Sequence, residues 1–122
     1  VRDIMHTGDR VPLVALGTSM PDAVKILSSK RFGCVGVIDA EGKLCGIVTE
    51  GDMARHLARD LSVLDVDDVM TRNPKVIDGA ALASTAAAMI NKHGIGALLV
   101  VDENHCPVGL IHFHDLLRIG VA

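Results

Sequence analysis

The chain alternates short apolar runs with segments that have the hydrophobic spacing of a helix. Between positions 20 and 27, apolar side chains recur at the i, i+3, i+4 and i+7 positions of one helix face: Met20, Ala23, Val24 and Leu27. Ser19, with Asp22 three residues later, resembles a capping box at the start of this helix. Two apolar runs follow at 34–38 and 44–48, and the segment DAEGK between them has the Asp and Gly of a hairpin-like turn. These patterns predict a helix followed by two paired strands.

The same order of segments occurs twice. GCVGVIDAEGKLCGIVTEGD at 33–52 aligns without a gap on GALLVVDENHCPVGLIHFHD at 96–115, with a constant shift of 63 positions (115 − 52 = 63). The triplets DIM and DVM, near the start of each copy, also correspond to each other. Self-similarity at a fixed spacing is the mark of a repeat protein, so two copies are predicted, 1–63 and 64–122.

Each copy predicts the same set of elements. A brief strand precedes the helix, at 13–15 and 76–77, and a second helix closes the copy, at 50–59 and 115–119. The expected fold class is therefore α/β (α+β), with two β-α-β-β-α repeats. Because a unit of about 60 residues buries too little surface alone, the repeats are expected to pack against each other around a pseudo-twofold axis. Small ligands tend to bind between such repeats.

Composition and charge narrow the class of protein. No apolar run reaches the roughly 18 residues of a membrane-spanning helix. A net charge of −3 and an aromatic content of 2% provide neither the basic face nor the stacking surfaces that bind a nucleic acid polymer. The 3 cysteines lack a C-x-x-C spacing and are expected to stay reduced, which predicts a cytoplasmic location. The first residues, VRD, show no initiator Met and no signal-peptide pattern, so we expect a longer polypeptide.

The segments TEGD and HFHD, which end the second apolar run of each copy, carry the candidate chemistry. Thr49, with Asp52 three residues later, has the pattern of a helix capping box. His112 stands where Thr49 stands in the first copy, and imidazole is a poor cap, so helix stability does not explain the substitution. We expect His112 and His114 to be largely neutral rings that donate hydrogen bonds to an anionic ligand oxygen.

Metal binding and catalysis are the alternative chemistries for the histidines. A zinc site at His112 and His114 needs at least one more ligand, and His6 and Asp115 are the candidates. A catalytic His-Asp pair needs an activated nucleophile, and the sequence has no nucleophile motif. We therefore expect no catalytic residue and no resident metal.

The patterns D-h-M, h-G-h-h-D and G-h-h-T-x-x-D, where h is hydrophobic, resemble the CBS module over essentially the whole chain. The resemblance implies a tandem (Bateman) module that binds nucleotides, usually adenine nucleotides, in clefts between the repeats and that forms a dimer of pairs. In this family the Asp of T-x-x-D typically holds the ribose hydroxyls and the Thr lies nearer the phosphate. The candidate ligand-binding residues are Thr49, Asp52, the matching His112, His114 and Asp115, the loop residues His6, Thr7, Gly8, Thr71 and Asn73, and the backbones of Cys34, Val35, Gly96 and Ala97, where a base would lie.

DIMHTGDRVP at 3–12 and HFHDLLRIGVA at 112–122 also resemble the carboxy-terminal part of D-arabinose 5-phosphate isomerases. In these enzymes a sugar isomerase (SIS) domain precedes a CBS pair and interconverts D-arabinose 5-phosphate and D-ribulose 5-phosphate for Kdo, lipopolysaccharide or capsule synthesis. The resemblance implies an SIS domain in the same polypeptide and a dimer of CBS pairs within a tetrameric enzyme. No cofactor is required, and the regulatory ligand is expected to be CMP-Kdo, the activated sugar of that pathway, or an adenine nucleotide. A structural dimerisation module with empty binding sites is the alternative, and a histidine metal site is the third.

Overall fold

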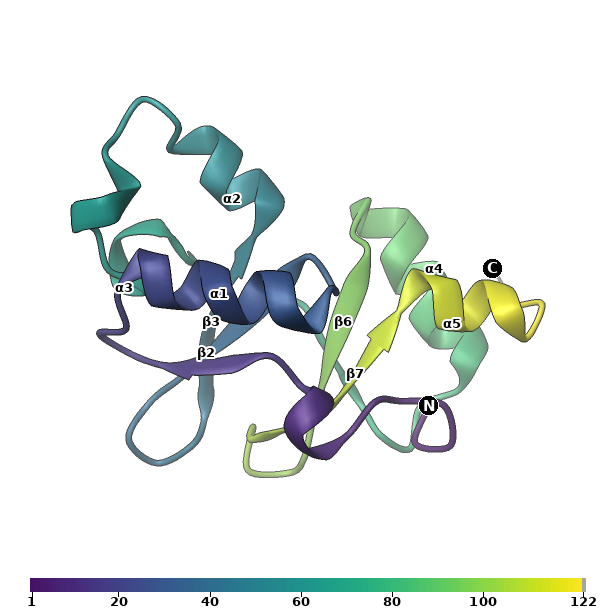
Figure 1. The fold of residues 1–122 in the computed structure, drawn as a ribbon. Coiled ribbons are helices and arrows are strands. Elements are labelled where there is room, and N and C mark those ends of the chain that lie inside the picture. The colour runs from purple at the N-terminus through teal and green to yellow at the C-terminus, as the bar shows by residue number, and fades with distance from the viewer. Residues whose placement is uncertain (122) are drawn as a thin grey trace. The chain divides into compact units, whose positions relative to one another are not determined.

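The computed structural model describes residues 1–121, which form two compact units (Figure 1). One unit is continuous in sequence, Pro12–Pro74, and we call it the continuous unit. The other joins Val1–Val11 to Lys75–Ala122, and we call it the split unit. Each unit has its own sheet, helices and hydrophobic core.

The continuous unit contains a 4-stranded sheet with helices packed on it. Its elements, in chain order, are β1 (Leu13–Ala15), α1 (Met20–Lys30), β2 (Cys34–Ile38), β3 (Leu44–Thr49), α2 (Glu50–Arg55), the 3-10 helix η2 (Leu61–Val63), α3 (Val66–Val69) and β4 (Thr71–Arg72). The strand order is β1-β2-β3-β4. β1 and β2 are parallel, whereas β3 is antiparallel to both β2 and β4. The α1 helix thus connects two parallel strands, which a tight turn cannot do.

The split unit contains a 3-stranded sheet of matching topology. Its elements are the 3-10 helix η1 (Gly8–Arg10), β5 (Val76–Asp78), α4 (Ala83–His93), β6 (Ala97–Val101), β7 (Pro107–His112) and α5 (Phe113–Arg118). β5 is parallel to β6, and β6 is antiparallel to β7. His6 adds a single antiparallel bridge to Leu110 of β7. This bridge corresponds to the pairing of β4 with β3, because Thr71 lies opposite Ile47 there.

The predicted fold class and the order β-α-β-β-α are confirmed in both copies. The closing helix of the first copy is shorter than expected, because α2 ends at Arg55 and not at Arg59. Leu57, just beyond it, is 75% exposed, and a helix this short depends on packing for its stability. The closing helix of the second copy starts at Phe113, two residues earlier than expected, because His112 acts as its cap.

The first residues of each sequence copy pack in the unit formed by the strands of the other copy. Residues 1–11 belong to the split unit, where His6 pairs with β7. Residues 71–72 form β4, which pairs with β3 of the continuous unit. The sequence repeats, 1–63 and 64–122, therefore differ from the compact units at their amino-terminal residues, 1–11 and 64–74. We call these two stretches the exchanged segments.

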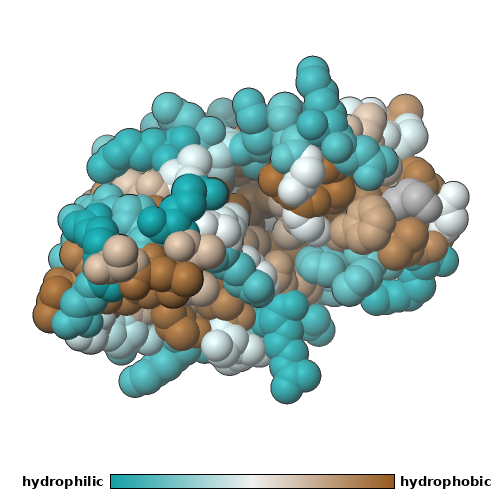
Figure 2. Space-filling model, turned by 90° about the horizontal axis from the view of Figure 1, so that it is seen from above, coloured by the Kyte–Doolittle hydropathy of each residue, from teal (hydrophilic) through white to brown (hydrophobic). Residues whose placement is uncertain are grey.

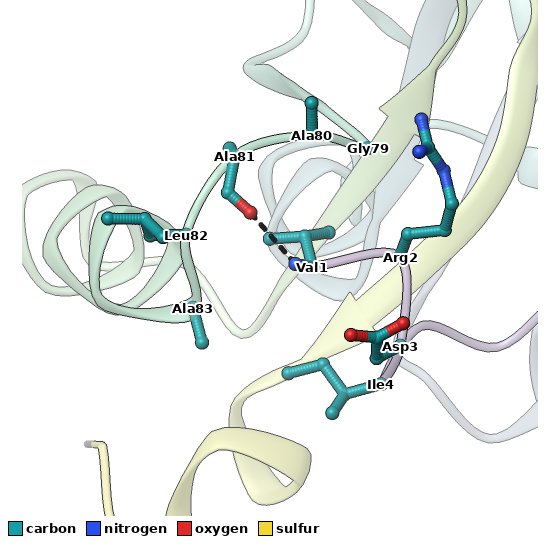
Figure 3. A pocket seen from close by; sticks show the side chains of 9 residues that line it. All are labelled: Val1, Arg2, Asp3, Ile4, Gly79, Ala80, Ala81, Leu82 and Ala83. Atoms are coloured by element: carbon teal, nitrogen blue, oxygen red, sulfur yellow. Dashed lines mark hydrogen bonds between the residues drawn. The ribbon is translucent and has the colours of Figure 1, made fainter.

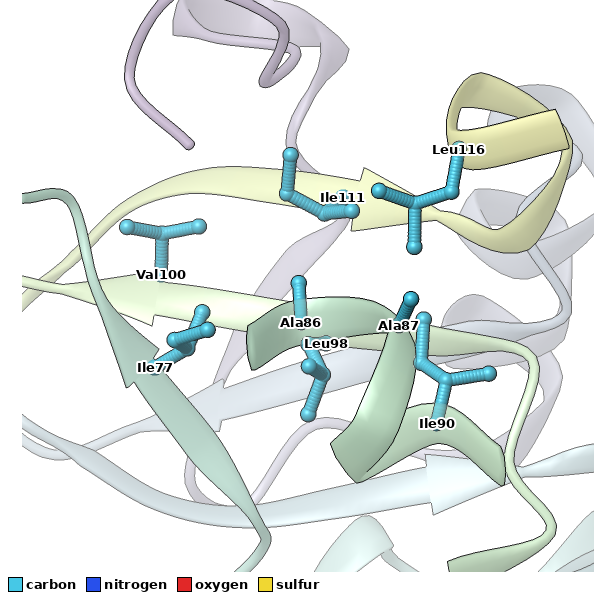
Figure 4. Packing of buried hydrophobic residues seen from close by; sticks show 8 residues of the cluster. All are labelled: Ile77, Ala86, Ala87, Ile90, Leu98, Val100, Ile111 and Leu116. Carbon is cyan, nitrogen blue, oxygen red and sulfur yellow. The ribbon is translucent and has the colours of Figure 1, made fainter. Parts of the chain in front are cut away.

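A separate hydrophobic core lies inside each unit. In the split unit the buried residues come from α4, α5 and the inner face of the sheet (Figure 4): Ile77, Ala86, Ala87, Ile90, Leu98, Val100, Ile111 and Leu116. Val1, Ile4 and Met5 of the amino-terminal segment pack against this core. The core of the continuous unit consists of Met20, Ala23, Val37, Val48, Val66, Val69 and Met70. The α1 helix thus buries the face that its spacing predicted.

Methionines of the D-h-M triplets lie directly against strand glycines. A Cβ atom added to Gly109 would lie 2.5 Å from the Met5 sulfur and 3.0 Å from the carbonyl oxygen of His6. A Cβ atom on Gly46 would lie 2.5 Å from the Met70 sulfur. Each glycine therefore permits the close approach that holds the exchanged segment on its strand.

Gly109→Ala is expected to lower the free energy of unfolding by about 1–3 kcal/mol, because the added methyl group forces Met5 and the adjoining backbone to move. Gly96→Ala is the matched control, since its Cβ would meet nothing within 4 Å. The control should change stability by no more than about 0.5 kcal/mol. Chemical unfolding of both variants measures the difference, and equal effects would contradict the close packing at Gly109.

Candidate functional site

Asp52 is the central polar residue of the continuous unit. Thr49 is the last residue of β3 and the cap of α2, and its hydroxyl accepts the backbone N–H of Asp52 at 3.1 Å. The Asp52 carboxylate in return accepts the backbone N–H of Thr49 at 2.8 Å. This reciprocal pair is the capping box that the TEGD pattern predicted, and it turns the carboxylate back toward the end of β3.

Two further side chains donate to the Asp52 carboxylate. The Thr71 hydroxyl, from the exchanged segment, donates to Oδ1 at 2.6 Å, and the Arg55 guanidinium contacts the same oxygen. Asp52 is only 2% exposed, and burial by itself raises the pKa of a carboxyl group. Hydrogen bonds from Thr71, Thr49 and Arg55 outweigh burial, so the pKa of Asp52 lies below its usual value. The group is therefore a carboxylate at neutral pH.

Asp115 occupies the same position in the split unit and is 6% exposed. Its carboxylate accepts the backbone N–H of His112 at 2.9 Å. The imidazole of His6, from the exchanged segment, lies with Nε2 3.1 Å from Oδ1 and 3.0 Å from Oδ2. Because a carboxylate only accepts, Nε2 of His6 is the donor. Arg118 adds an ion pair at 3.5 Å, so Asp115 is surrounded by donors as Asp52 is.

His112 caps α5, which corrects the expectation that helix stability does not explain this residue. Its backbone is extended (φ −103°, ψ 149°), which lets Nδ1 accept the backbone N–H of His114 at 3.1 Å. Burial lowers the pKa of His112, and the neighbouring His114, His6 and Arg118 lower it further, against an opposing effect of Asp115. The lowered pKa favours the neutral ring that the sequence predicted. Because Nδ1 accepts a hydrogen bond, the proton of the neutral ring lies on Nε2, which the sequence did not predict.

The orientation of the two histidines, which the sequence left open, brings their rings together. The ring centroids of His112 and His114 lie 4.6 Å apart with the planes tilted by 52°. The turn into α5 between them does not separate the rings, because a residue in the first helical turn lies beside the cap. His6 contacts the buried Asp115 carboxylate directly, and the rings of His112 and the exposed His114 lie together at the same strand-to-helix turn.

The two units keep the same charged frame and differ in the groups around it. Asp52 with Arg55 corresponds to Asp115 with Arg118. The three remaining positions change from the continuous to the split unit: Thr49 to His112, Gly51 to His114 and Thr71 to His6. The sequence singled out His112 from this set but did not pair Thr71 with Asp52, or His6 with Asp115 as a hydrogen-bonded pair.

The other predicted ligand residues are of two kinds, residues at the start of β2 and β6 and exposed residues of the amino-terminal segments. Cys34 pairs with Thr49 across β2 and β3, and Ala97 pairs with His112 across β6 and β7. Val35 and Gly96 are their neighbours in the chain. Thr7, Gly8 and Asn73 are exposed residues of the two exchanged segments. Burial raises the pKa of the Cys34 thiol to about 12, so this residue contributes backbone and not a reactive sulfur.

A pocket in the split unit lies away from the predicted residues. It has a volume of about 560 Å³ and lies between the amino-terminal segment and the loop before α4 (Figure 3). Its lining consists of Val1, Arg2, Asp3, Ile4, Gly79, Ala80, Ala81, Leu82 and Ala83. The amino group of Val1 donates to the carbonyl of Ala81 at 2.8 Å across it. None of the predicted ligand-binding residues lines this pocket.

The arrangement of possible metal ligands and the length of the apolar helices are relevant to other classes of function. Within residues 1–121, no group of 3 or more His, Cys, Asp and Glu side chains is arranged to hold a metal ion. No helix in the described part of the chain is long and apolar enough to span a membrane.

A comparison with protein-family models matches the CBS domain twice, at residues 1–59 and 66–122. The chain belongs to the CBS domain family. The two matches correspond to the two sequence repeats, so the chain is a tandem CBS pair.

Curated relatives of this CBS pair include sugar phosphate isomerases. Arabinose 5-phosphate isomerase KdsD of Pseudomonas aeruginosa is 43% identical over 123 residues, which cover 99% of this chain and 38% of that protein. The KdsD of Escherichia coli strain K12 is 36% identical, with 100% and 38% covered. The chain therefore spans about 38% of the length of these relatives.

Solved structures similar to this CBS pair contain adenine ligands. The CBS domain pair of protein MJ0100, in complex with 5′-methylthioadenosine and S-adenosyl-L-methionine, has a TM-score of 0.86 at 28% identity and covers 98% of this chain and 93% of its own. CBSX2 in complex with AMP has a TM-score of 0.83 at 25% identity and covers 98% and 94%. Two similar CBS pairs have thus been solved with adenine ligands bound.

Proposed function

We propose that this CBS pair is the regulatory nucleotide-binding module of an arabinose 5-phosphate isomerase-like enzyme. The observation that carries the proposal is the pair of buried carboxylates, Asp52 and Asp115, at equivalent strand-to-helix turns. The module acts by binding and contributes no catalytic group. The isomerase reaction, between D-arabinose 5-phosphate and D-ribulose 5-phosphate, belongs to an SIS domain of the same polypeptide.

The carboxylates are suited to hold the hydroxyl pair of a ribose. An ionised carboxylate accepts hydrogen bonds at two oxygens, which matches two adjacent hydroxyl donors. Thr71 and His6 supply donors to these oxygens from the exchanged segments. A ribose that binds would replace these side chains and so would loosen the contact between each exchanged segment and its helix.

That exchange gives a route from binding to regulation. A ligand shifts a conformational equilibrium by its difference in affinity for the two states, and by no more. Here the two states differ in whether His6 and Thr71 contact Asp115 and Asp52. The CMP-Kdo of the Kdo and lipopolysaccharide pathway is the ligand we favour, as feedback on a cytoplasmic enzyme, and an adenine nucleotide is the second choice.

The test is a thermal-shift panel of CMP, CMP-Kdo, AMP and ATP. A ligand present at a hundred times its dissociation constant should add about 2.7 kcal/mol to the stability of the chain, which is a rise of several degrees in Tm. A shift with CMP-Kdo or an adenine nucleotide supports the proposal and identifies the preferred base. No shift with any of the four would contradict it.

A second candidate function is a dimerisation module with empty sites. Hydrophobic side chains reach the surface in separate patches between hydrophilic regions (Figure 2), and the exposed ones include Leu57, Val63, Leu117 and Ile119. Apolar patches of this kind favour association, and we propose a homodimer of CBS pairs within a tetrameric enzyme. If the chain is a dimerisation module, Leu117→Ser should dissociate the homodimer. Every nucleotide of the thermal-shift panel should then leave the Tm of the unaltered chain unchanged.

A further inference from the structure

The split unit differs from the continuous unit by a set of titratable side chains. Around Asp52 the ligand-facing groups are two hydroxyls and a glycine, none of which titrates near neutral pH. Around Asp115 the matching positions are His6, His112 and His114. The same frame is therefore built once from hydroxyl groups and a glycine and once from three imidazoles, and histidine is the side chain that most commonly exchanges protons in the physiological pH range.

Charge at Asp115 limits which ligands the split unit can bind. An anionic group placed beside a buried carboxylate is repelled, and the repulsion is strong because little water screens it. In each unit one arginine partly offsets this repulsion, Arg55 or Arg118, and both arginines are largely exposed. Among the described residues that surround these two carboxylates, further groups that can become cationic lie in the split unit, and they are the imidazoles.

We infer that the split unit binds the phosphate or carboxylate of its ligand together with a proton taken up by the His6, His112 and His114 cluster, whereas the continuous unit binds without proton uptake. This inference rests on the proposed nucleotide-binding function and adds the ligand class and its regulation. The affinity of the split unit for an anionic ligand then rises as pH falls. Uptake of one full proton corresponds to a tenfold change in affinity per pH unit.

The groups that face the cluster set the sign of this dependence. His112 is faced by His114, Asp115 and Arg118 of α5 and by His6 of the exchanged segment. Burial lowers the pKa of His112, and the nearby His114, His6 and Arg118 lower it further, which favours the neutral ring. Because Nδ1 of His112 accepts the His114 N–H, a ligand anion would stabilise an imidazolium at His6 or His114, while His112 donates from Nε2. A ligand hydroxyl that replaces His6 on Asp115 also frees the His6 ring to donate to the same anion.

The experiment is calorimetric titration with AMP and CMP in two buffers of different ionisation enthalpy, which gives the protons taken up per bound ligand. The variant Asp52→Asn impairs the site of the continuous unit and leaves that of the split unit intact. The variant Asp115→Asn does the reverse. The AMP phosphate has a second pKa of about 6 and titrates at either site, so the difference between the two variants is decisive. Asp52→Asn should take up more protons, approaching one, and should bind more weakly at about pH 8 than at about pH 6.

The variant H6T/H112T/H114G gives the split unit the residues of the continuous unit. It should bind without extra proton uptake, and Thr is a good cap, so the start of α5 is preserved. Equal proton uptake by Asp52→Asn and Asp115→Asn would overturn the inference without any need for this variant. Binding by Asp115→Asn alone would also overturn it and would leave the proposed function intact. Absence of binding by the unaltered chain would overturn both.

Discussion

Leu116→Ala is expected to lower the free energy of unfolding by about 2–5 kcal/mol, whereas Leu117→Ala, one residue later, should lower it by less than about 1 kcal/mol. Leu116 is 0% exposed and lies in the core of the split unit (Figure 4), where truncation leaves a cavity. Leu117 is 46% exposed on the same helix. The two substitutions remove the same atoms, so the difference reports burial alone.

Urea unfolding of both variants measures this difference, and the larger loss corresponds to a fall in Tm of roughly 10 °C. The comparison bears on the site as well as on the core, because Asp115 directly precedes Leu116 in α5. Asp115 and Leu116 are both buried on α5, so the rotation of the helix that buries Leu116 also sets the position of Asp115. Equal losses from the two variants would mean that α5 is rotated, and the geometry at Asp115 would then be wrong.

Asp52→Asn and Asp115→Asn are each expected to weaken nucleotide binding at their own site by about tenfold to a hundredfold. Asparagine keeps the shape of the side chain but loses the charge, and a hydrogen bond to a charged group contributes about 1.5–3 kcal/mol. The new amide group also places a donor where the Thr71 hydroxyl or the His6 ring donates. Calorimetry with the ligand that gives the largest thermal shift measures the loss.

Asp22→Asn is the control for these two variants. Asp22 is an exposed carboxylate of α1, and the change should leave the dissociation constant unaltered. If the double variant D52N/D115N remains folded and still binds as the unaltered chain does, the carboxylates are not the ligand contacts. If no nucleotide binds to the unaltered chain or to the double variant, while both still form the homodimer, the dimerisation function is favoured.

Local patterns in the sequence predicted the fold and part of the site. The repeat, the helix face from Met20 to Leu27 and the paired strands were all readable because neighbouring residues in the chain determine them. The capping box of Thr49 and Asp52 is local in the same sense, since only three positions separate its members. The turn DAEGK also formed as expected, with Asp39 accepting backbone N–H groups within it.

Contacts between distant segments were not predicted. The His6–Asp115 pair joins residues 109 positions apart, and the Thr71–Asp52 pair joins residues of different sequence copies. Both depend on the exchange of the amino-terminal segments, which the repeat pattern does not reveal. A signal was nevertheless present, because His6 and Thr71 each follow the Met of a D-h-M triplet at the same position.

The role of His112 as a helix cap was missed for a different reason. Cap preferences rank side chains by frequency, and imidazole ranks below Thr. In the structure the extended backbone at His112 brings Nδ1 within 3.1 Å of the backbone nitrogen of His114, so a ring nitrogen performs the function of a hydroxyl. The cap also fixes the tautomer, with the remaining proton on Nε2, which leaves that nitrogen as the donor of the ring.

The most direct test of nucleotide binding at the two carboxylates is a two-dimensional amide NMR titration of the unaltered chain with CMP-Kdo, and with AMP in parallel. If nucleotides bind at these carboxylates, the largest shifts are expected at Thr49, Asp52 and Thr71 in the continuous unit and at His6, His112 and Asp115 in the split unit. Shifts confined to the pocket of Figure 3, at Arg2, Ile4 and Gly79–Ala83, would contradict it. So would a spectrum unchanged by either ligand.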